Sequence, residues 1–556
     1  MSTQNLLFNL KKYLSPIDVK QIEEGGEIYF EKKEVNLLIG HLKREFNFQI
    51  LLDITAEDLL GKKNVELEHK HRFEVVYTLL SLAEHFRLRI RVPLDEDVSL
   101  KTIKSNFPNA EWFENEVWDM FGIQIDDQNQ TRILNHKNFK GFPLRKDFVP
   151  EKTEELFDPI GHFDEEESVS VIERGMRSVV NIGPIHPITK GSVRAVFELD
   201  GEEINRNFFE IGYNHRCIEK TFETHTWSQG LLIAEELSEN APFNASFAYA
   251  YGVEKLYNLE IPDRAKALRM VFSELSRITD HFNCLADLSL SSGNETIMFK
   301  CFDLRERIYE LFEKASGNRI RVPINVLGGV LQDLPLGWIS DCFTQMKYIE
   351  DNLLMIDKLM TRSKIWMSRS NVCKIDVQTS LEYGFTGPCL RASGINYDLR
   401  KVSPYYFYND VEFEIPLGVN GFSYDRYLVR LEEIRQSLKI IFQILDNLPM
   451  GNIIAEHPLT QVFSSKKEAR AEGHKVFLKN SSKLEPKKVY SAIESSNGEL
   501  GFYMISDGSE KPWRIKVRSP SMSHLQGLSS ISNGMFLEDV LVGYSSLNIS
   551  TGELDR

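Results

Sequence analysis

The stretch that decides the fold spans residues 263–289 and reads DRAKALRMVFSELSRITDHFNCLADLS. Its apolar residues recur at intervals of three and four, as they do on the buried face of an α-helix. The same spacing is found in residues 215–237, 346–367 and 424–445. Four such stretches within one part of the chain predict a large helical bundle.

Strand patterns lie on both sides of this helical region. Residues 71–94 contain the alternating segment RLRIRV, and strands are also expected at Val179–Glu210. After residue 488, GELGFYMISDG and KPWRIKVRSPS predict a hairpin sheet. The expected fold class is therefore α+β, with helices and strands in separate regions.

Length and composition predict more than one domain. A chain of 556 residues is too long for a single core. Residues 146–170 read KDFVPEKTEELFDPIGHFDEEESVS and have the acidic, proline-containing composition of an exposed connection. We expect a small α/β domain at 1–148, an acidic linker at 149–175, and a mainly helical domain with a small peripheral β-sheet at 176–556.

Charge and hydropathy exclude several classes of function. The formal net charge of −15 argues against a nucleic-acid-binding protein, which needs a basic face. The chain has no apolar run of the length that a membrane span requires. Its first twenty residues lack the basic-then-apolar pattern of a signal peptide, which predicts a cytosolic location with any membrane contact made through partners.

The six cysteines are scattered, and no two of them form a C-x-x-C pair: Cys217, Cys284, Cys301, Cys342, Cys373 and Cys389. Structural zinc and iron–sulfur sites usually take their ligands from such short pairs. In a cytosolic protein a disulfide framework is also not expected. The pattern therefore predicts that this chain holds no metal or cluster of its own.

A stiff corner precedes the strands of the helical half. Residues 181–202 read NIGPIHPITKGSVRAVFELDGE, and the prolines leave the backbone around His186 few conformations. This segment is either a turn into a β-hairpin or a rigid loop that presents His186 and Lys190 to a bound molecule. His186 fits a structural role and a site role about equally well.

Long motifs in both halves resemble a known family. The first half resembles the C subunit of bacterial NADH–quinone oxidoreductase, respiratory complex I, in AEWFENEVWDMFGIQIDD (110–127) and RILNHKNFKGFPLRKDF (132–148). The second half resembles the D subunit of the same enzyme. The motifs that carry this second resemblance are NIGPIHP (181–187), IGYNHRCIEK (211–220), LRERIYELFEKASGNR (304–319), LRASGINYDLRK (390–401), PWRIKVRSPS (512–521) and GELDR (552–556).

The resemblance implies a fused C/D subunit in the peripheral arm of a multi-subunit enzyme. The D-like half would share the fold of the nickel–iron hydrogenase large subunit. It would pack against a subunit that carries an iron–sulfur cluster, and quinone would be reduced between the two. Other partners would carry FMN, NADH and further iron–sulfur clusters, and membrane-arm subunits would translocate ions. The assembly would lie on the cytoplasmic side of the inner (plasma) membrane.

Hydrogenase activity is not expected, although some hydrogenases share this architecture. Those enzymes bind nickel through two C-x-x-C pairs, and thiolates are the ligands that nickel needs. Ser238 and Ala241 stand where the early pair would be, and SSLNISTGELDR contains no cysteine for the late pair.

Four polar positions depart from the D-subunit pattern. The family places a histidine where this chain has Lys190, and a tyrosine where it has Glu239; both would donate hydrogen bonds to quinone. Near the partner's cluster, Glu236 replaces an arginine and Arg321 replaces a histidine. Asp287 matches an aspartate beside the quinone chamber; a surface position at the end of a helix is its alternative interpretation.

Two explanations of these changes remain open. An ammonium and a protonated carboxyl both donate hydrogen bonds, so the site can be rebuilt around an ion pair of Lys190 with Glu239. Alternatively, the chain is a complex I-like paralogue with a different acceptor, or a structural subunit whose quinone site has been lost. The joint change of charge at four positions favours a rebuilt site.

Overall fold

The computed structural model describes residues 19–22, 25–30, 35–62, 71–128, 130–149, 178–455 and 486–556. Helices and strands are both abundant, which confirms the α+β class. No helix in these ranges is long and apolar enough to cross a lipid bilayer. The predicted linker at 149–175 lies almost wholly outside the described residues.

The N-terminal part is built on a five-stranded sheet with the order β1-β2-β5-β4-β3. Within this sheet, only the contact of β2 with β5 is parallel. The strands β4 and β5 fall in the stretch where the sequence predicts strands. The elements of this part are β1 (Val19–Ile22), β2 (Gly25–Tyr29), α2 (Val35–Glu45), β3 (Ile50–Asp58), β4 (Phe73–Ser81), β5 (Phe86–Leu94), β6 (Leu100–Lys101), α3 (Ala110–Phe121) and β7 (Ile125–Asp126).

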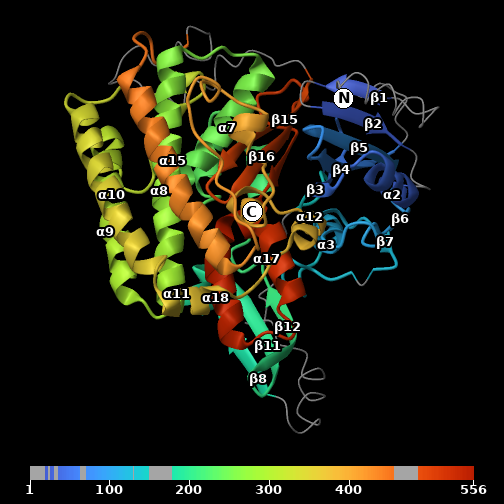
Figure 1. The fold of residues 1–556 in the computed structure, drawn as a ribbon. Coiled ribbons are helices and arrows are strands. Elements are labelled where there is room, and N and C mark those ends of the chain that lie inside the picture. Colours follow the sequence, from blue (N-terminus) through green and yellow to red (C-terminus); the bar gives the residue numbers. More distant parts are fainter. Residues whose placement is uncertain are drawn as a thin grey trace.

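The C-terminal part is dominated by long helices that lie side by side (Figure 1). The helices α8 (Asp263–Ser291) and α15 (Ser423–Asp446) occupy the predicted stretches almost residue for residue. They pack together with α9 (Glu295–Ser316) and α10 (Trp338–Met360). Residues 346–367 are not one helix, because α10 ends at Met360 and α11 (Lys364–Ser370) begins after a turn.

The predicted helix at 215–237 is wrong. The structure has two short helices there, α5 (Ile218–Thr224) and α6 (Gly230–Glu235), separated by His225 in an extended conformation. Local hydrogen bonds break the helix, since the backbone N–H of Thr226 donates to Gln229 Oε1 over 3.0 Å. In return, the hydroxyl of Thr226 accepts the backbone N–H of Gln229 over 3.4 Å, and short polar side chains compete with helical hydrogen bonds in this way.

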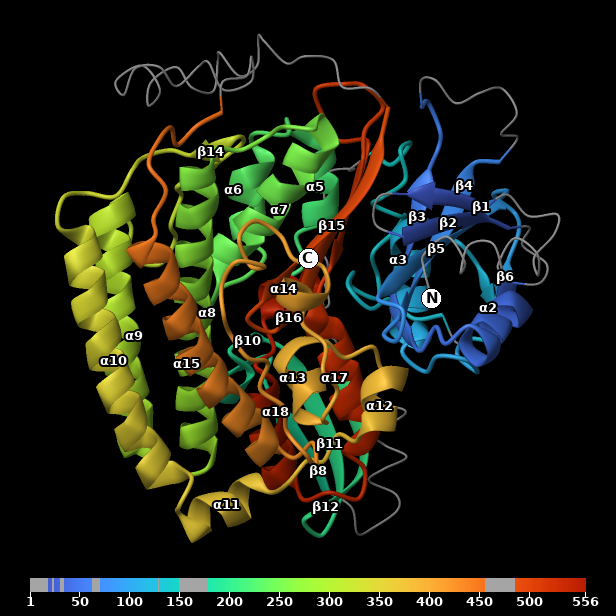
Figure 2. The same ribbon diagram turned by 45° about the horizontal axis from the view of Figure 1, so that its top comes forward.

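A three-stranded antiparallel sheet separates the long helices from the N-terminal part (Figure 2). It consists of β15 (Lys488–Ser495), β16 (Gly498–Ile505) and β17 (Arg514–Arg518), which confirms the predicted hairpin sheet. The strands β8 (Ser178–Ile182), β11 (Arg194–Asp200) and β12 (Glu203–Glu210) form another sheet that projects from the bundle in Figure 1. The remaining helices are α7 (Pro242–Tyr257), α12 (Val377–Glu382), α13 (Gly387–Ala392), α14 (Leu399–Val402), α17 (Pro520–Ile531), α18 (Leu537–Leu547) and α19 (Thr551–Asp555).

The N-terminal sheet meets β16 through the arginines of the RLRIRV segment. Arg87 contacts both carboxylate oxygens of Glu499, at 3.2 and 2.9 Å. Arg91 is fully buried and donates to the hydroxyl of Tyr503 over 2.8 Å. The alternating arginine face of β5 is therefore an interface within the molecule and not a solvated surface.

Candidate functional site

The loop that carries His186 and Lys190 is a small hairpin. The strands β9 (Ile185–His186) and β10 (Gly191–Ser192) pair around a short 3₁₀ turn at Pro187–Thr189. His186 caps this turn, because its Nδ1 accepts the backbone N–H of Ile188 over 3.3 Å. The contacts of His186 thus favour its structural role in shaping the loop.

Close contact with the C-terminal segment explains the glycine after Lys190. Lys190 ends the 3₁₀ turn in the left-handed conformation, with φ of 51°. A Cβ atom on Gly191 would lie 2.2 Å from Oγ1 of Thr551, so only glycine fits there. The loop is therefore fixed against the start of α19.

The ammonium group of Lys190 is held by two neighbours. It forms an ion pair with the carboxylate of Asp287 on α8, and it donates to Oδ1 of Asn548 over 2.6 Å. The lysine side chain is 12% exposed and that of Asp287 24%. Burial by itself lowers the pKa of Lys190, but the Asp287 carboxylate outweighs it and raises that pKa above its ordinary value. Lys190 is therefore charged at neutral pH.

One N–H of this ammonium has no partner among the residues that the structure describes. A lysine ammonium has three donors, and Asp287 and Asn548 take two of them. The remaining donor is available to an acceptor such as a carbonyl oxygen.

The predicted ion pair between Lys190 and Glu239 is wrong. The carboxylate of Glu239 instead accepts the hydroxyl of Ser550 at 2.6 Å, the hydroxyl of Thr551 at 2.7 Å and the backbone N–H of Gly552 at 2.7 Å. The segment 548–552 thus contacts both charges, Lys190 through Asn548 and Glu239 through residues 550–552. Three donors satisfy the carboxylate without a lysine. Sequence reasoning missed them because it used the terminal motif only as a family marker.

Glu236 and Arg321, the two residues expected near the partner's iron–sulfur cluster, contact each other. Arg321 forms a two-pronged ion pair with Glu236, in which its second nitrogen lies 3.0 Å from Oε2. Arg216 lies 3.7 Å from the same carboxylate. All three side chains are substantially exposed, so the pair contributes little to the stability of this chain.

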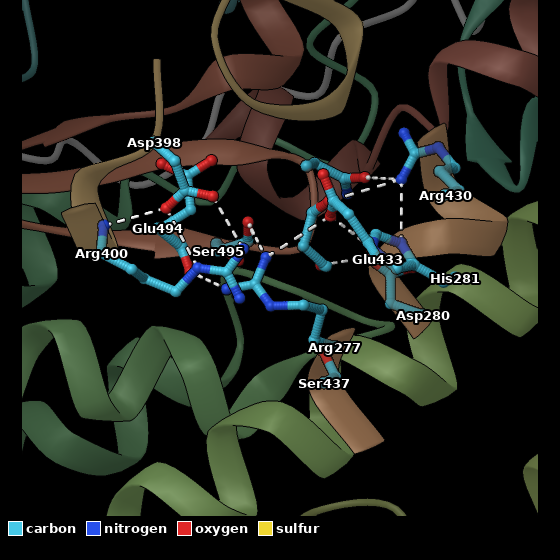
Figure 3. A network of polar contacts seen from close by, with 12 residues as sticks. Arg277, Asp280, His281, Asp398, Arg400, Arg430, Glu433, Ser437, Glu494 and Ser495 are labelled. Atoms are coloured by element: carbon cyan, nitrogen blue, oxygen red, sulfur yellow. Dashed lines mark hydrogen bonds and ion pairs between the residues drawn. The ribbon is translucent and has the colours of Figure 1, made fainter. Parts of the chain in front are cut away.

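Buried polar residues continue inward from Asn548, and no sequence motif indicates them. Nδ2 of Asn548 donates to Asp280, whose other carboxylate oxygen accepts the hydroxyl of Ser496. Figure 3 shows Asp280 beside a network that includes His281, Arg430 and Glu433. These side chains lie on α8 and α15, where they are buried although they are charged or polar.

His281 has a defined tautomer in this network. Arg430 approaches its Nδ1 at 3.2 Å, and arginine can only donate, so Nδ1 carries no proton. Nε2 therefore carries the proton and donates to Glu433 over 2.8 Å. Burial lowers the pKa of His281, which keeps the ring neutral, while Arg391 and His281 hold the pKa of Glu433 far below its ordinary value against the effect of burial.

Family models match both halves of the chain. The model described as "Respiratory-chain NADH dehydrogenase, 30 Kd subunit" matches residues 28–154, and the one described as "Respiratory-chain NADH dehydrogenase, 49 Kd subunit" matches residues 291–556. These two matches are in the order expected of a fusion of a C-like and a D-like part.

Full-length relatives carry both halves in one chain. The chain is 37% identical over 535 residues to the C/D subunit of NADH-quinone oxidoreductase from Bdellovibrio bacteriovorus, with 94% of each chain covered. The C/D subunit from Aeromonas hydrophila is 34% identical over 97% of this chain and 93% of the relative. That from Acidiphilium cryptum is 32% identical over 100% of this chain and 98% of the relative. The chain therefore belongs to the family of fused C/D subunits of NADH-quinone oxidoreductase, respiratory complex I, and is part of that enzyme.

Proposed function

We propose that this chain forms, with an iron–sulfur partner subunit, the site at which quinone is reduced. The assembly would lie on the cytoplasmic side of the inner (plasma) membrane, with FMN, NADH and iron–sulfur clusters on partner subunits and ion translocation in a membrane arm. Membership of the C/D family supports this placement.

We also propose that the chain divides into two domains joined by a linker. Residues 1–148 form the C-like domain, 149–175 the linker, and 176–556 a D-like domain with the fold of the nickel–iron hydrogenase large subunit. The separate family matches at 28–154 and 291–556 support the two-part division.

The carrying observation is the ammonium of Lys190 with one unused donor. In the proposed reaction this donor binds a quinone carbonyl oxygen. As negative charge builds up on that oxygen during reduction, a fixed ammonium stabilises it more than a mobile one does, because it needs no reorientation. Asp287 keeps the ammonium charged, and His186 shapes the loop that presents it.

The other site residues have different roles in this proposal. Glu239 fastens the segment 550–552 beside Lys190 and does not donate to quinone. Glu236 and Arg321 lie on the face that meets the partner with the iron–sulfur cluster, where they form an ion pair with each other.

Replacement of Lys190 by methionine in the assembled complex tests this function. Reduction of a soluble quinone analogue by NADH should fall roughly 10- to 100-fold, the value of a lost hydrogen bond from a charged donor. NADH oxidation by artificial acceptors should not change, because electrons reach those acceptors before the quinone site. Lys347→Met, at an exposed position on α10, is the matched control.

Equal quinone reduction by the Lys190→Met and wild-type complexes would refute the donor role. A wild-type complex that oxidises NADH with artificial acceptors but does not reduce quinone would identify the chain as a structural subunit or as one that serves another acceptor.

A further inference from the structure

Asn548 occupies an unusual position next to the site. It lies directly after α18 in the left-handed conformation, with φ of 57°, and its side chain is 1% exposed. Asparagine adopts this conformation more readily than most residues, but glycine would fit it better. The side chain at this position therefore has to be explained by its contacts.

The two ends of the Asn548 amide face opposite kinds of group. Nδ2 lies 2.8 Å from Oδ1 of Asp280 and 2.8 Å from Oδ1 of Asn497, and a carboxylate oxygen can only accept. Oδ1 lies 2.6 Å from the ammonium of Lys190, which can only donate. A flipped amide would place N–H groups against the ammonium and an oxygen against the carboxylate, so the neighbours fix one orientation.

The groups that orient this amide are themselves fixed. Asp280 lies on the long helix α8, and its second oxygen accepts the hydroxyl of Ser496. Oδ1 of Asn497 also accepts from Arg430 over 3.3 Å. All four side chains are buried (Asp280, Ser496, Asn497 and Arg430). The carbonyl oxygen that faces Lys190 is therefore part of a rigid support.

Such a support limits the freedom of a lysine. Its ammonium ends a four-carbon chain with many rotamers, and one ion pair leaves the group free to turn about that contact. Asp287 provides the first contact, and the oxygen of Asn548 provides a second in another direction. With two directions fixed, the direction of the third N–H is fixed as well.

We propose that Asn548 is a positioning residue that aims the unused N–H of Lys190 at the substrate, and that Asp280 sets the orientation of its amide. This inference rests on the proposed function, in which Lys190 donates to quinone. Asn548 itself does not touch the substrate in this arrangement.

A double-mutant cycle in the assembled complex tests the positioning role. Asn548→Gly removes the amide and keeps the backbone conformation accessible. It should lower kcat/KM for a quinone analogue about tenfold when Lys190 is present, and less than about twofold when it is combined with Lys190→Met. NADH oxidation by artificial acceptors should stay constant in all variants. Asn352→Asp, at a partly exposed position on α10, is the control for the Asn548→Asp variant described below.

The outcomes separate this inference from the proposed function. If Lys190→Met alone leaves quinone reduction intact, the proposed function fails. If Lys190→Met lowers it but Asn548→Gly has the same effect in both backgrounds, or no effect, the donor role stands and the positioning role is wrong.

An exchange of the two side chains provides an independent test. Asn548→Asp turns an oxygen towards Asp280 in place of an N–H, and two carboxylates then face each other. It should lower quinone reduction, and the addition of Asp280→Asn should restore most of the loss, because an amide donor again faces a carboxylate. No loss in the single variant, or no recovery in the double variant, contradicts the proposed role of Asp280.

Discussion

The contacts of Glu239 predict that its shape matters and its charge does not. Its carboxylate receives three hydrogen bonds from residues 550–552, at 2.6, 2.7 and 2.7 Å. Glu239→Gln can keep all three contacts, since the amide oxygen still accepts and the hydroxyl of Ser550 accepts as easily as it donates. Glu239→Tyr removes all of them.

The size of the effect of Glu239→Tyr follows from the number of hydrogen bonds that Glu239 accepts. At about 1 kcal/mol each, the three contacts stabilise the attachment of segment 550–552 by about 3 kcal/mol, or roughly 100-fold in its population. Hydrogen exchange at the amide of Gly552, measured in the assembled complex, should accelerate by roughly that factor in Glu239→Tyr and by less than about threefold in Glu239→Gln. Quinone reduction should fall in the same order.

The contacts of Glu239 also predict the outcome of restoring the family's usual residues at positions 190 and 239. The double variant Lys190→His with Glu239→Tyr reproduces the side chains that the D-subunit pattern has at these positions, and an ion-pair hypothesis expects it to recover activity. The structure predicts the reverse, because the tyrosine detaches the segment that adjoins Lys190. Activity of this double variant above that of Lys190→His alone would refute our account of Glu239, and so would a Glu239→Gln variant as impaired as Glu239→Tyr.

Two further predictions concern buried carboxyl groups. Burial raises the pKa of Glu553 to about 8, so its carboxyl should be protonated at pH 7. The infrared band of this protonated carboxyl should disappear in Glu553→Gln, and in the wild type as the pH rises through 8. Because an unfolded glutamate loses its proton near pH 4.3, the free energy of unfolding should fall more steeply in the wild type than in Glu553→Gln as the pH rises from about 4.3 to 8. Equal slopes in the two proteins would contradict this prediction. Glu116 forms an ion pair with Lys516 and lies 2.6 Å from Arg556, and all three side chains are buried. Glu116→Gln should therefore lower the free energy of unfolding, measured by denaturant titration, by about 3–5 kcal/mol, against less than about 1 kcal/mol for Glu350→Gln at an exposed position. Equal losses in the two variants would contradict this prediction.

The elements that can be predicted from the sequence are those whose pattern is set by local burial. The helices at 263–289 and 424–445 are confirmed because long amphipathic stretches have one dominant way to bury their apolar face. The prediction of one helix at 215–237 is wrong because the side chains around Thr226 form hydrogen bonds with the backbone. Apolar periodicity contains no information about this competition.

The candidate site could be predicted only in part. The family pattern points to His186, Lys190 and Asp287, but the ion pair inferred from the changed residues gives Lys190 the wrong partner, Glu239. The choice between Asp287 and Glu239 depends on where segment 548–552 lies, more than 350 residues further along the chain from Lys190. The roles of Asn548 and Asp280 depend on the same distant contact, so neither residue type nor spacing indicates them.

The arginine face of β5 has a consequence for how this protein can be encoded. Since Arg87 and Arg91 attach the first half of the chain to β16 by hydrogen bonds, the covalent connection mainly supplies a high effective concentration of one half near the other. A gene divided between the two halves would yield two polypeptides with the same contact surfaces. Their association would then depend on expression level, and matched synthesis of the two products would replace the peptide bond.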